Sequence, residues 1–276
     1  MIDILLSFAE RAGQTMIKSQ QDAGNLGNKD SSVCSIVTKT DVLISDMFAK
    51  TVAKNFANLN YMIIDEETIS QYGDKVFEKT ADTEYQFVID PIDGTIQYAN
   101  AHPLYGLTVG VYKNTKPLLG LIYLPQTREL LYFDGKKCYY SENAFTANER
   151  KTELLPHTKT ASPIIFGHYW LWQLTENFSL EKTLLLNYFS AVSQSLYTLT
   201  GKAKAYALSL HLWDIAGVIP IADYLGYKIL EYGTKKSYNA ISEEFFTKGM
   251  DTKNPCILCF PEDFEEICTI LKPRKN

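Results

Sequence analysis

The sequence has no long apolar run and no surplus of positive charge. None of its stretches approaches the ~18 consecutive apolar residues that a membrane-spanning helix needs. Residues 1–17 carry acids early, at Asp3 and Glu10, and lack the basic start of a secretion signal. The formal net charge of −5 is opposite in sign to the basic surplus of general nucleic-acid binders. These absences predict a soluble, cytoplasmic protein without a membrane or nucleic-acid partner.

Cysteine is scarce and irregularly spaced, which argues against a disulfide framework. The sequence has five cysteines, an odd number. They are Cys34, Cys138, Cys256, Cys259 and Cys268. Cys256 and Cys259 form a C-x-x-C, which alone is a weak sign of zinc or redox chemistry. Their surroundings read as a short buried strand, where residues three apart point to opposite faces. We therefore expect two separate core thiols, reduced as in the cytoplasm.

The composition is otherwise that of an ordinary globular protein, with 46% hydrophobic and 21% charged residues among 276. Apolar spacing predicts a helix over residues 3–20 and, after a polar loop over 20–32, a second helix over 41–58. Thr40 or Asp41 could cap the second helix. Short apolar runs between turn residues predict five strands, the last three as an antiparallel meander. These strands cover residues 61–64, 84–89, 107–112, 118–123 and 130–133.

A polar segment over residues 151–160 separates this N-terminal α+β portion from a second portion. There the predicted strands alternate with helices, as in an α/β arrangement. The predicted strands are residues 164–167, 187–192, 203–210 and 257–260. The predicted helices are residues 194–200, 214–225 and 261–271. The sequence therefore predicts portions 1–150 and 151–276, packed as one compact unit.

Acidic residues stand at three comparable places along the chain. Asp90 and the pair Glu66-Glu67 each end a predicted strand, and Asp214 begins a predicted helix, where ligands collect in layered folds. If these places meet, four carboxylates including Asp93 crowd one site, and no Arg or Lys lies within the motifs. Oxygen ligands favour Mg²⁺, Ca²⁺ or Mn²⁺. Two such ions ~3.5–4 Å apart can support displacement at phosphorus.

The central acidic segment combines two aspartates with a turn. It reads Asp90-Pro91-Ile92-Asp93-Gly94-Thr95. We expect Pro91 to end the strand and Asp93 to cap a helix that begins at Thr95. The carbonyl of Ile92 and the two aspartates could then converge on one ion. Because Gly94 lacks a side chain, an anion could approach the backbone amides at the helix start. Metal and amides together would suit a phosphate ester.

Each feature alone has a simpler interpretation. Asp-Gly is a common turn, Asp214 could merely cap its helix, and Glu66-Glu67 could be a surface pair. Their joint occurrence favours a metal site.

Four segments resemble the inositol monophosphatase family of lithium-sensitive, magnesium-dependent phosphatases. These segments are the Val-Thr-x-x-Asp segment at Ile36–Asp41, the paired glutamates at Ile63–Glu67, the central signature at Val88–Thr95 and the Trp-Asp motif at Leu212–Gly217. Their order and spacing agree along nearly the whole chain, although Asp65 stands where glycine is usual. Haloacid-dehalogenase-type phosphatases have a similar Asp-x-Asp-Gly-Thr string. The three-residue spacing of Asp90 and Asp93, with Pro91 between them, argues against that family.

The resemblance implies a layered α/β/α/β/α sandwich of the inositol monophosphatase and fructose-1,6-bisphosphatase type, in a homodimer. It also implies that Glu66, Asp90 and the Ile92 carbonyl hold one Mg²⁺, and that Asp90, Asp93 and Asp214 hold a second. A third, weaker ion could be supported by Glu66 through water. The family is inhibited by lithium in competition with magnesium.

The resemblance further implies catalytic roles. Thr95, hydrogen-bonded to Asp41, would orient and deprotonate the attacking water together with Glu66, and Glu67 would support the metal ligands from behind. His211, beside a tryptophan, could contact the substrate. The candidate phosphate and substrate contacts are Asp93, Gly94, Thr95, Ala191 and His211.

The part of the sequence that would recognise the alcohol departs from the family pattern. Phe189 stands where glycine is expected, and the predicted strand 205–211 lacks the acid that reads a hydroxyl in inositol-cleaving members. We expect hydrolysis of a small phosphorylated metabolite, resembling inositol 1-phosphate or a sugar phosphate. Two alternatives stay open: 3′-phosphoadenosine 5′-phosphate or histidinol phosphate as substrate, and a metal-binding member that is non-catalytic and binds proteins.

Overall fold

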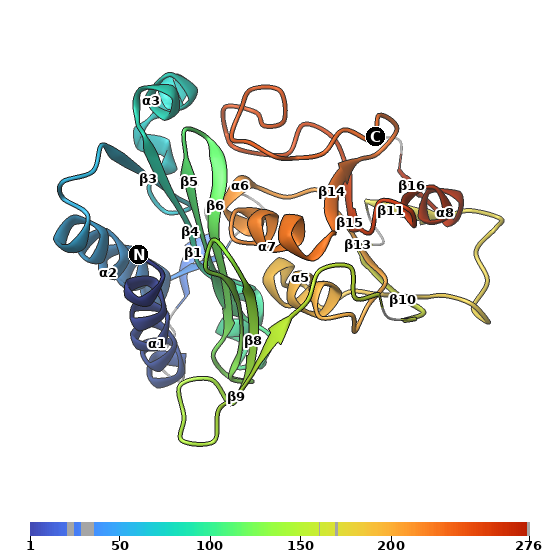
Figure 1. The fold of residues 1–276 in the computed structure, drawn as a ribbon, viewed down its shortest axis with the longest axis horizontal. Helices are drawn as coiled ribbons and strands as arrows, with labels where there is room; N and C mark the ends of the chain where they lie inside the picture. The colour runs from blue at the N-terminus through green and yellow to red at the C-terminus, as the bar shows by residue number, and fades with distance from the viewer. Residues whose placement is uncertain (21–24, 29–35, 160, 169–170, 275–276) are drawn as a thin grey trace.

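The computed structural model describes residues 1–20, 25–28, 36–159, 161–168 and 171–274. The elements stack in five layers, which alternate between helices and sheets (Figure 1). In Figure 1 the layers run from the blue helices, through a green sheet and orange helices, to a second sheet and a red helix. This is the layered α/β/α/β/α sandwich that the family resemblance predicts.

The first layer consists of α1 (Ile2–Ser19) and α2 (Lys39–Asn55), close to the predicted helices. Correcting the prediction, the cap of α2 is Thr38 rather than Thr40 or Asp41. The Thr38 side chain accepts hydrogen bonds from the amides of both residues, and the Asp41 carboxylate accepts one from the Thr38 amide at 2.9 Å. The predicted polar loop includes β1 (Asn25–Asn28), which pairs with β2 (Ile36–Thr38), and otherwise lies outside the described residues.

The second layer is a seven-stranded sheet in the sequential order β3 to β9. Its strands are β3 (Tyr61–Asp65), β4 (Tyr85–Asp93), β5 (Gly106–Lys113), β6 (Lys116–Leu124), β7 (Glu129–Phe133), β8 (Cys138–Glu142) and β9 (Arg150–Leu154). Only the β3–β4 pair is parallel, because two short 3₁₀ turns (Ile69–Gln71, Gly73–Lys75) and α3 (Val76–Asp82) connect these strands. The predicted meander is confirmed in β5, β6 and β7.

Strand β4 corrects the prediction that pairing stops at Asp90. The strand continues to Asp93, and its register with β5 shifts between Asp90 and Asp93. Pro91 and Ile92 are the extra residues, so they form a bulge, where a proline without an amide hydrogen is tolerated. The bulge brings both aspartates to the end of one strand, directly before α4 (Thr95–Ala99).

The third layer contains α5 (Ala191–Leu199), α6 (Leu212–Ile215) and α7 (Val218–Leu225). The fourth is a five-stranded sheet of order β12-β10-β13-β15-β14. Its strands are β12 (Leu184–Leu186), β10 (Ile164–Gly167), β13 (Ala205–Leu208), β15 (Cys256–Cys259) and β14 (Lys228–Glu231). Helix α8 (Phe264–Ile270) and the pair β11 (Trp172–Leu174) and β16 (Leu271–Pro273) lie on its outer side.

Two predictions in the C-terminal portion were wrong. Residues 187–192 are not a strand, because the strand lies earlier, at β12, and α5 already begins at Ala191. The predicted helix 214–225 is two helices, interrupted at Ala216 and Gly217. The other predicted strands and helices are confirmed with shifted ends, for example 257–260 as β15 and 261–271 as α8.

Three apolar clusters fill the spaces between the layers. One cluster packs α1 and α2 on the first sheet, a second lies between the two sheets, and a third lies under α8. Cys256 belongs to the second cluster and Cys259 to the third, which confirms that these thiols point to opposite faces. Cys34 lies outside the described residues. Within the described ranges, no helix is both long and apolar enough to cross a membrane.

The middle cluster includes residues from both portions, such as Met62 and Val88 from the first sheet and Leu258 from the second. Shared packing of this kind supports one compact unit. The division into residues 1–150 and 151–276 stays a prediction.

Candidate metal centre

Three aspartates from distant parts of the chain meet at one point. Asp90, Asp93 and Asp214 each offer a carboxylate oxygen, and these oxygens all lie within 4.8 Å of one another. All three side chains are buried. Asp90 and Asp93 lie on either side of the β4 bulge, whereas Asp214 lies in the short helix α6. The predicted convergence of these acids is present in the fold.

Asp214 reaches the other acids because α6 and α7 lie against the sheet without intervening side chains. A Cβ added to Gly110 of β5 would lie 2.4 Å from the Ala216 carbonyl oxygen, and one added to Gly217 would lie 2.3 Å from Thr108 Oγ1. The Tyr112 hydroxyl donates to the Ala216 carbonyl oxygen at 3.0 Å. These contacts fix the helix junction two residues beyond Asp214.

Asp93 does not cap α4, contrary to the prediction. The N-cap position is Gly94, which adopts a left-handed conformation at φ +78°. The Asp93 carboxylate instead accepts hydrogen bonds from the amides of Ala191 and Val192, at 3.0 and 2.9 Å, and from the Ser190 hydroxyl. The N-terminus of α5 therefore holds an aspartate of the seven-stranded sheet. The free amides and the helix dipole at this N-terminus favour negative charge.

Burial and repulsion between like charges raise the pKa values of Asp90 and Asp93. The pKa of Asp90 lies well above its usual range, first because the group is buried and then because Glu66, Asp93 and Asp214 carry like charge. Burial and then the charge of Asp214 raise the pKa of Asp93 to about 7, although the hydrogen bonds that Asp93 accepts act to lower its pKa. Asp90 Oδ1 is buried and accepts no hydrogen bond from any residue that the structure describes. A divalent cation would satisfy this oxygen and offset the repulsion, so the residues fit a metal.

The acids open into a cleft of ≈ 230 Å³. Most of the predicted site residues line it, namely Glu66, Asp90, Ile92, Asp93, Gly94, Thr95, His211 and Asp214. Five further residues line the cleft: Ile96, Gln97, His168, Phe189 and Trp213. The sequence had placed the Ile96 amide among the helix-start amides near the phosphate, had included Trp213 in the Trp-Asp motif, and had marked Phe189 as a departure from the family pattern. Sequence reasoning missed Gln97 and His168. Asp41, Glu67 and Ala191 do not line the cleft.

The expected hydrogen bond between Thr95 and Asp41 is absent. The Thr95 hydroxyl donates to the Ile92 carbonyl oxygen at 2.9 Å, and the Asp41 carboxylate accepts hydrogen bonds from the Thr38 amide and hydroxyl. Asp41 is nevertheless close enough to add to the repulsion at Asp90. Burial raises the pKa of Asp41 to about 7, with a smaller contribution from Glu67.

The paired glutamates are held by the residue that replaces the usual glycine. Asp65 is buried at the end of β3, where one of its carboxylate oxygens accepts a hydrogen bond from the Ser45 hydroxyl of α2. The other carboxylate oxygen accepts a hydrogen bond from the Glu67 backbone amide at 2.9 Å. Asp65 thus fixes the turn that carries Glu66 into the cleft and links it to the helical layer.

His211 stands at the cleft with both ring nitrogens facing acids. Its ring stacks on Trp213 with centroids 4.5 Å apart, its Nε2 lies 3.0 Å from Asp251 Oδ1, and its Nδ1 lies 3.6 Å from Asp214 Oδ2. Burial opposes the charged form, yet Asp214 and then Asp251 raise the His211 pKa. No sequence pattern had indicated Asp251, which lies on a loop far along the chain.

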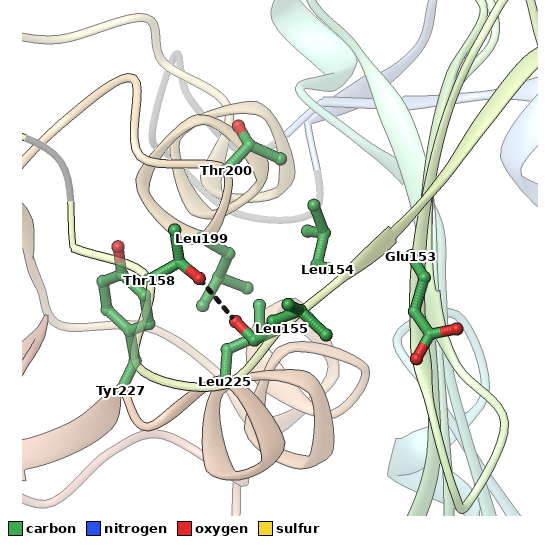
Figure 2. A pocket seen from close by; sticks show the side chains of 8 residues that line it. All are labelled: Glu153, Leu154, Leu155, Thr158, Leu199, Thr200, Leu225 and Tyr227. Atoms are coloured by element: carbon green, nitrogen blue, oxygen red, sulfur yellow. Dashed lines mark hydrogen bonds between the residues drawn. The ribbon is translucent and has the colours of Figure 1, made fainter.

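A second pocket, of ≈ 270 Å³, lies between β9 and the helices α5 and α7 (Figure 2). Its lining is largely leucine, and the Thr158 hydroxyl donates to the Leu155 carbonyl oxygen at 3.1 Å (Figure 2). Glu153 is the sole carboxylate among the described residues that line this pocket, so these residues do not offer a second cluster of metal ligands.

Comparison with known proteins places this arrangement in a family. The model of the inositol monophosphatase family matches residues 1–253. The fructose-1,6-bisphosphatase/inositol-1-monophosphatase of Thermotoga maritima is 23% identical over 252 residues, which cover 90% of this chain and 91% of that relative.

Solved structures support the same fold. The IMPase of Thermotoga maritima aligns with a TM-score of 0.70 at 19% identity, covering 96% of this chain and 94% of that chain. An IMPase/NADP phosphatase complexed with Mg²⁺ and phosphate aligns with a TM-score of 0.73 at 16% identity, covering 96% and 92%. With the carboxylates at the positions that the family motifs predict, the chain belongs to the inositol monophosphatase family of phosphatases.

Proposed function

We propose that this phosphatase hydrolyses a phosphate monoester of a small metabolite with Mg²⁺ as cofactor. The observation that carries the proposal is the cluster of Asp90, Asp93 and Asp214, buried, mutually repelling and within 4.8 Å. A buried cluster of this kind is costly unless it is protonated or bound to a cation. The cleft beside it has room for a phosphate group.

The proposed ligands follow the family resemblance. Glu66, Asp90 and the Ile92 carbonyl would hold one ion, and Asp90, Asp93 and Asp214 a second, with a third weaker ion near Glu66. Four carboxylates balance the charge of two divalent cations. When bound, Mg²⁺ supplies Lewis-acid stabilisation of the charge on the attacking and leaving oxygens.

The chain's own groups would bind the phosphate and orient water. The amides of Gly94 and Thr95, at the start of α4, would donate to phosphate oxygens. The Thr95 hydroxyl donates to Ile92 and keeps its lone pairs, so it can accept a hydrogen bond from water. Glu66 lines the cleft and can accept a proton, whereas Asp41 would act through its charge. Glu67, held by Asp65, would support Glu66 from behind.

The substrate, assembly and location are further parts of the proposal. Ala191 and His211 are the candidate contacts for the rest of the substrate, which would resemble inositol 1-phosphate or a sugar phosphate. His211 lines the cleft, but Ala191 would have to act through Asp93. A homodimer and inhibition by Li⁺ rest on the family resemblance, whereas a cytoplasmic location rests on the cysteine usage and on the lack of a secretion signal in the sequence. Sedimentation and metal titration would measure the subunit number and the two or three ions per subunit.

The decisive experiment is release of inorganic phosphate from a panel of phosphate esters, with and without Mg²⁺. The panel includes inositol, sugar, nucleotide and histidinol phosphates. We expect release that depends on Mg²⁺ and is lost in EDTA. Absence of release from every ester, while Mg²⁺ still binds by calorimetry, would reject the hydrolase and favour a non-catalytic, protein-binding role.

A further inference from the structure

Phe189 places an aromatic ring at the mouth of the metal centre. It lines the cleft together with His168, and 43% of its surface is exposed. The next residue, Ser190, donates its hydroxyl to Asp93. Phe189 thus directly precedes a residue that is hydrogen-bonded to an acid of the cluster. If the phosphate of a substrate binds at the metal centre, the alcohol part of that substrate would lie near the Phe189 ring.

The backbone at Phe189 adopts a conformation that a bulky residue rarely takes. Its φ is +56°, in the left-handed region where the glycine usual in the family would be unstrained. Such strain persists where neighbouring contacts impose it, and it concentrates at ligand sites. The strained backbone of Phe189 therefore lies at the cleft that would hold the ligand.

Hydrogen bonds on both sides hold this segment in place. The Phe189 amide donates to Asn187 Oδ1 at 2.9 Å, and the Tyr188 amide donates to Gln194 Oε1 at 3.0 Å. The Gln97 side-chain amide, from α4, donates to the Tyr188 carbonyl oxygen at 2.9 Å. These hydrogen bonds fix the backbone that bears the Phe189 ring and connect it to α4, where the phosphate is proposed to bind.

A second ring stands beside the first. The rings of His168 and Phe189 meet edge to face, with centroids 6.1 Å apart at 72°. Asn187 joins them, because its side-chain amide nitrogen lies 2.9 Å from His168 Nδ1 while its oxygen accepts the Phe189 amide. The two residues form a fixed aromatic wall, which we call the 168/189 wall.

The charged side chains around the cleft favour an uncharged substrate group at the 168/189 wall. The described residues that line the cleft include four carboxylates and no Lys or Arg. Two divalent cations would balance these carboxylates, so the described lining offers no Lys or Arg to neutralise a second anionic group on the substrate. Strand β13 has no acid, and its four residues are buried, so it offers no carboxylate to bind the hydroxyls of a polyol.

From these observations, and resting on the proposed hydrolysis of a small phosphate monoester, we infer that the substrate alcohol carries an uncharged planar aromatic ring in place of a polyol such as inositol. Phe189 selects this ring by stacking at the 168/189 wall. Stacking of a planar ring on an aromatic side chain changes affinity by about 5- to 150-fold. A polyol of similar size gains little from such a wall.

The test compares three monoesters with Mg²⁺ present. Benzyl phosphate carries a planar ring, cyclohexylmethyl phosphate a ring of similar size that is not planar, and inositol 1-phosphate a polyol. We expect the wild type to favour benzyl phosphate in kcat/KM by tenfold or more over inositol 1-phosphate. Over cyclohexylmethyl phosphate we expect about 2- to 13-fold.

Two variants of Phe189 and one distant control assign the preference to the ring. Phe189→Gly removes the ring and suits the backbone, so we expect normal folding and a benzyl-to-inositol ratio lowered about 5- to 150-fold. Phe189→Leu should keep part of the ratio but lose the preference for the planar ring. Leu180→Gly removes a 74% exposed apolar side chain outside the cleft and should leave the ratio unchanged.

Binding measurements separate this inference from the proposed function. If the wild type hydrolyses none of the esters, the proposed function fails, and calorimetric binding of benzyl and inositol phosphates in Ca²⁺ still tests the wall. Equal wild-type affinities or rates for the two esters would overturn the inference. A Phe189→Gly variant that weakens both esters equally would overturn it as well, since that result indicates a structural role.

Discussion

At the scale of single residues, buried acids make the metal-free protein sensitive to pH. The pKa values of Asp41 and Asp93 are raised to about 7, from 3.8. The folded state therefore holds protons that the unfolded chain releases, and stability falls as the pH rises from about 4 to about 7. We expect a higher unfolding temperature in EDTA at pH 5.5 than at pH 8, measured by scanning calorimetry.

Mg²⁺ should reduce that difference, because it would neutralise Asp93, whereas Asp41 does not line the cleft. Asp93→Asn should flatten the pH dependence in EDTA. A metal-free protein that becomes more stable between pH 5.5 and pH 8 would contradict the assignment of these raised pKa values.

Removing one negative charge should separate stability from activity. In Asp90→Asn the shape is kept while repulsion with Glu66, Asp93 and Asp214 is relieved. We expect a higher unfolding temperature in EDTA, loss of the added stability in Mg²⁺, and turnover lowered about 100-fold or more. Calorimetry and phosphate release measure these effects. Asp82→Asn, at an exposed acid of α3, is the control and should match the wild type.

The acids were predictable as residues, but their partners were not. Residue type and position after strands indicated Glu66, Asp90, Asp93 and Asp214 as possible ligands. The amides that hold Asp93, however, come from residues almost one hundred positions later. Local spacing carries no information on such contacts, so the sequence favoured the nearer role of a helix cap.

At the scale of elements, the close approach of α6 and α7 to the first sheet leaves no room for a methyl group. In Gly110→Ala the new Cβ would lie 2.4 Å from the backbone oxygen of Ala216. We expect the free energy of unfolding to fall by about 1–3 kcal/mol, and Mg²⁺ to bind more weakly because Asp214 moves with the helix. Denaturant unfolding and calorimetric titration measure these changes.

Gly167→Ala is the matched control for this prediction. Gly167 also lies in a strand, and a Cβ there would meet its nearest neighbours at 3.4 Å, an ordinary contact. Equal stability losses in the two variants would show that loss of glycine itself, rather than the approach to Ala216, determines the effect.

Helices and strands were predicted correctly where the apolar periodicity is strong. The prediction failed where the periodicity is weak or where tertiary contacts override it. The meander β5 to β7 is apolar and bounded by turns, so its strands were found. Strand β9 is mostly exposed, and its polar sequence gave no signal. The break between α6 and α7 comes from packing against the sheet, which a helical pattern over 214–225 cannot reveal.

At the scale of the whole molecule, the middle apolar cluster should make unfolding cooperative. It joins both sheets and the helices between them, so each portion alone would leave the inner face of its sheet uncovered. We expect the full chain to show one thermal transition by near- and far-ultraviolet circular dichroism. A fragment of residues 1–159 should show no cooperative transition, because the inner face of its sheet loses its cover.

Two separate transitions, or cooperative unfolding of the fragment, would instead support two independent domains divided near residue 150. The sequence patterns alone predicted an α+β portion followed by an α/β portion. The stacking into five layers followed only from the family resemblance, since it depends on contacts between residues far apart, such as those that Asp93 makes with α5.

The split origin of the acid cluster also has a consequence for synthesis on the ribosome. Asp90 and Asp93 emerge early, whereas Asp214 and the amides of α5 emerge about 100–120 residues later, a delay on the order of ten seconds at translation rates of about 5–20 residues per second. During that interval the cluster lacks Asp214 and the hydrogen bonds to Asp93. The metal centre can therefore be completed only once most of the chain has been made, so that a truncated product would lack it.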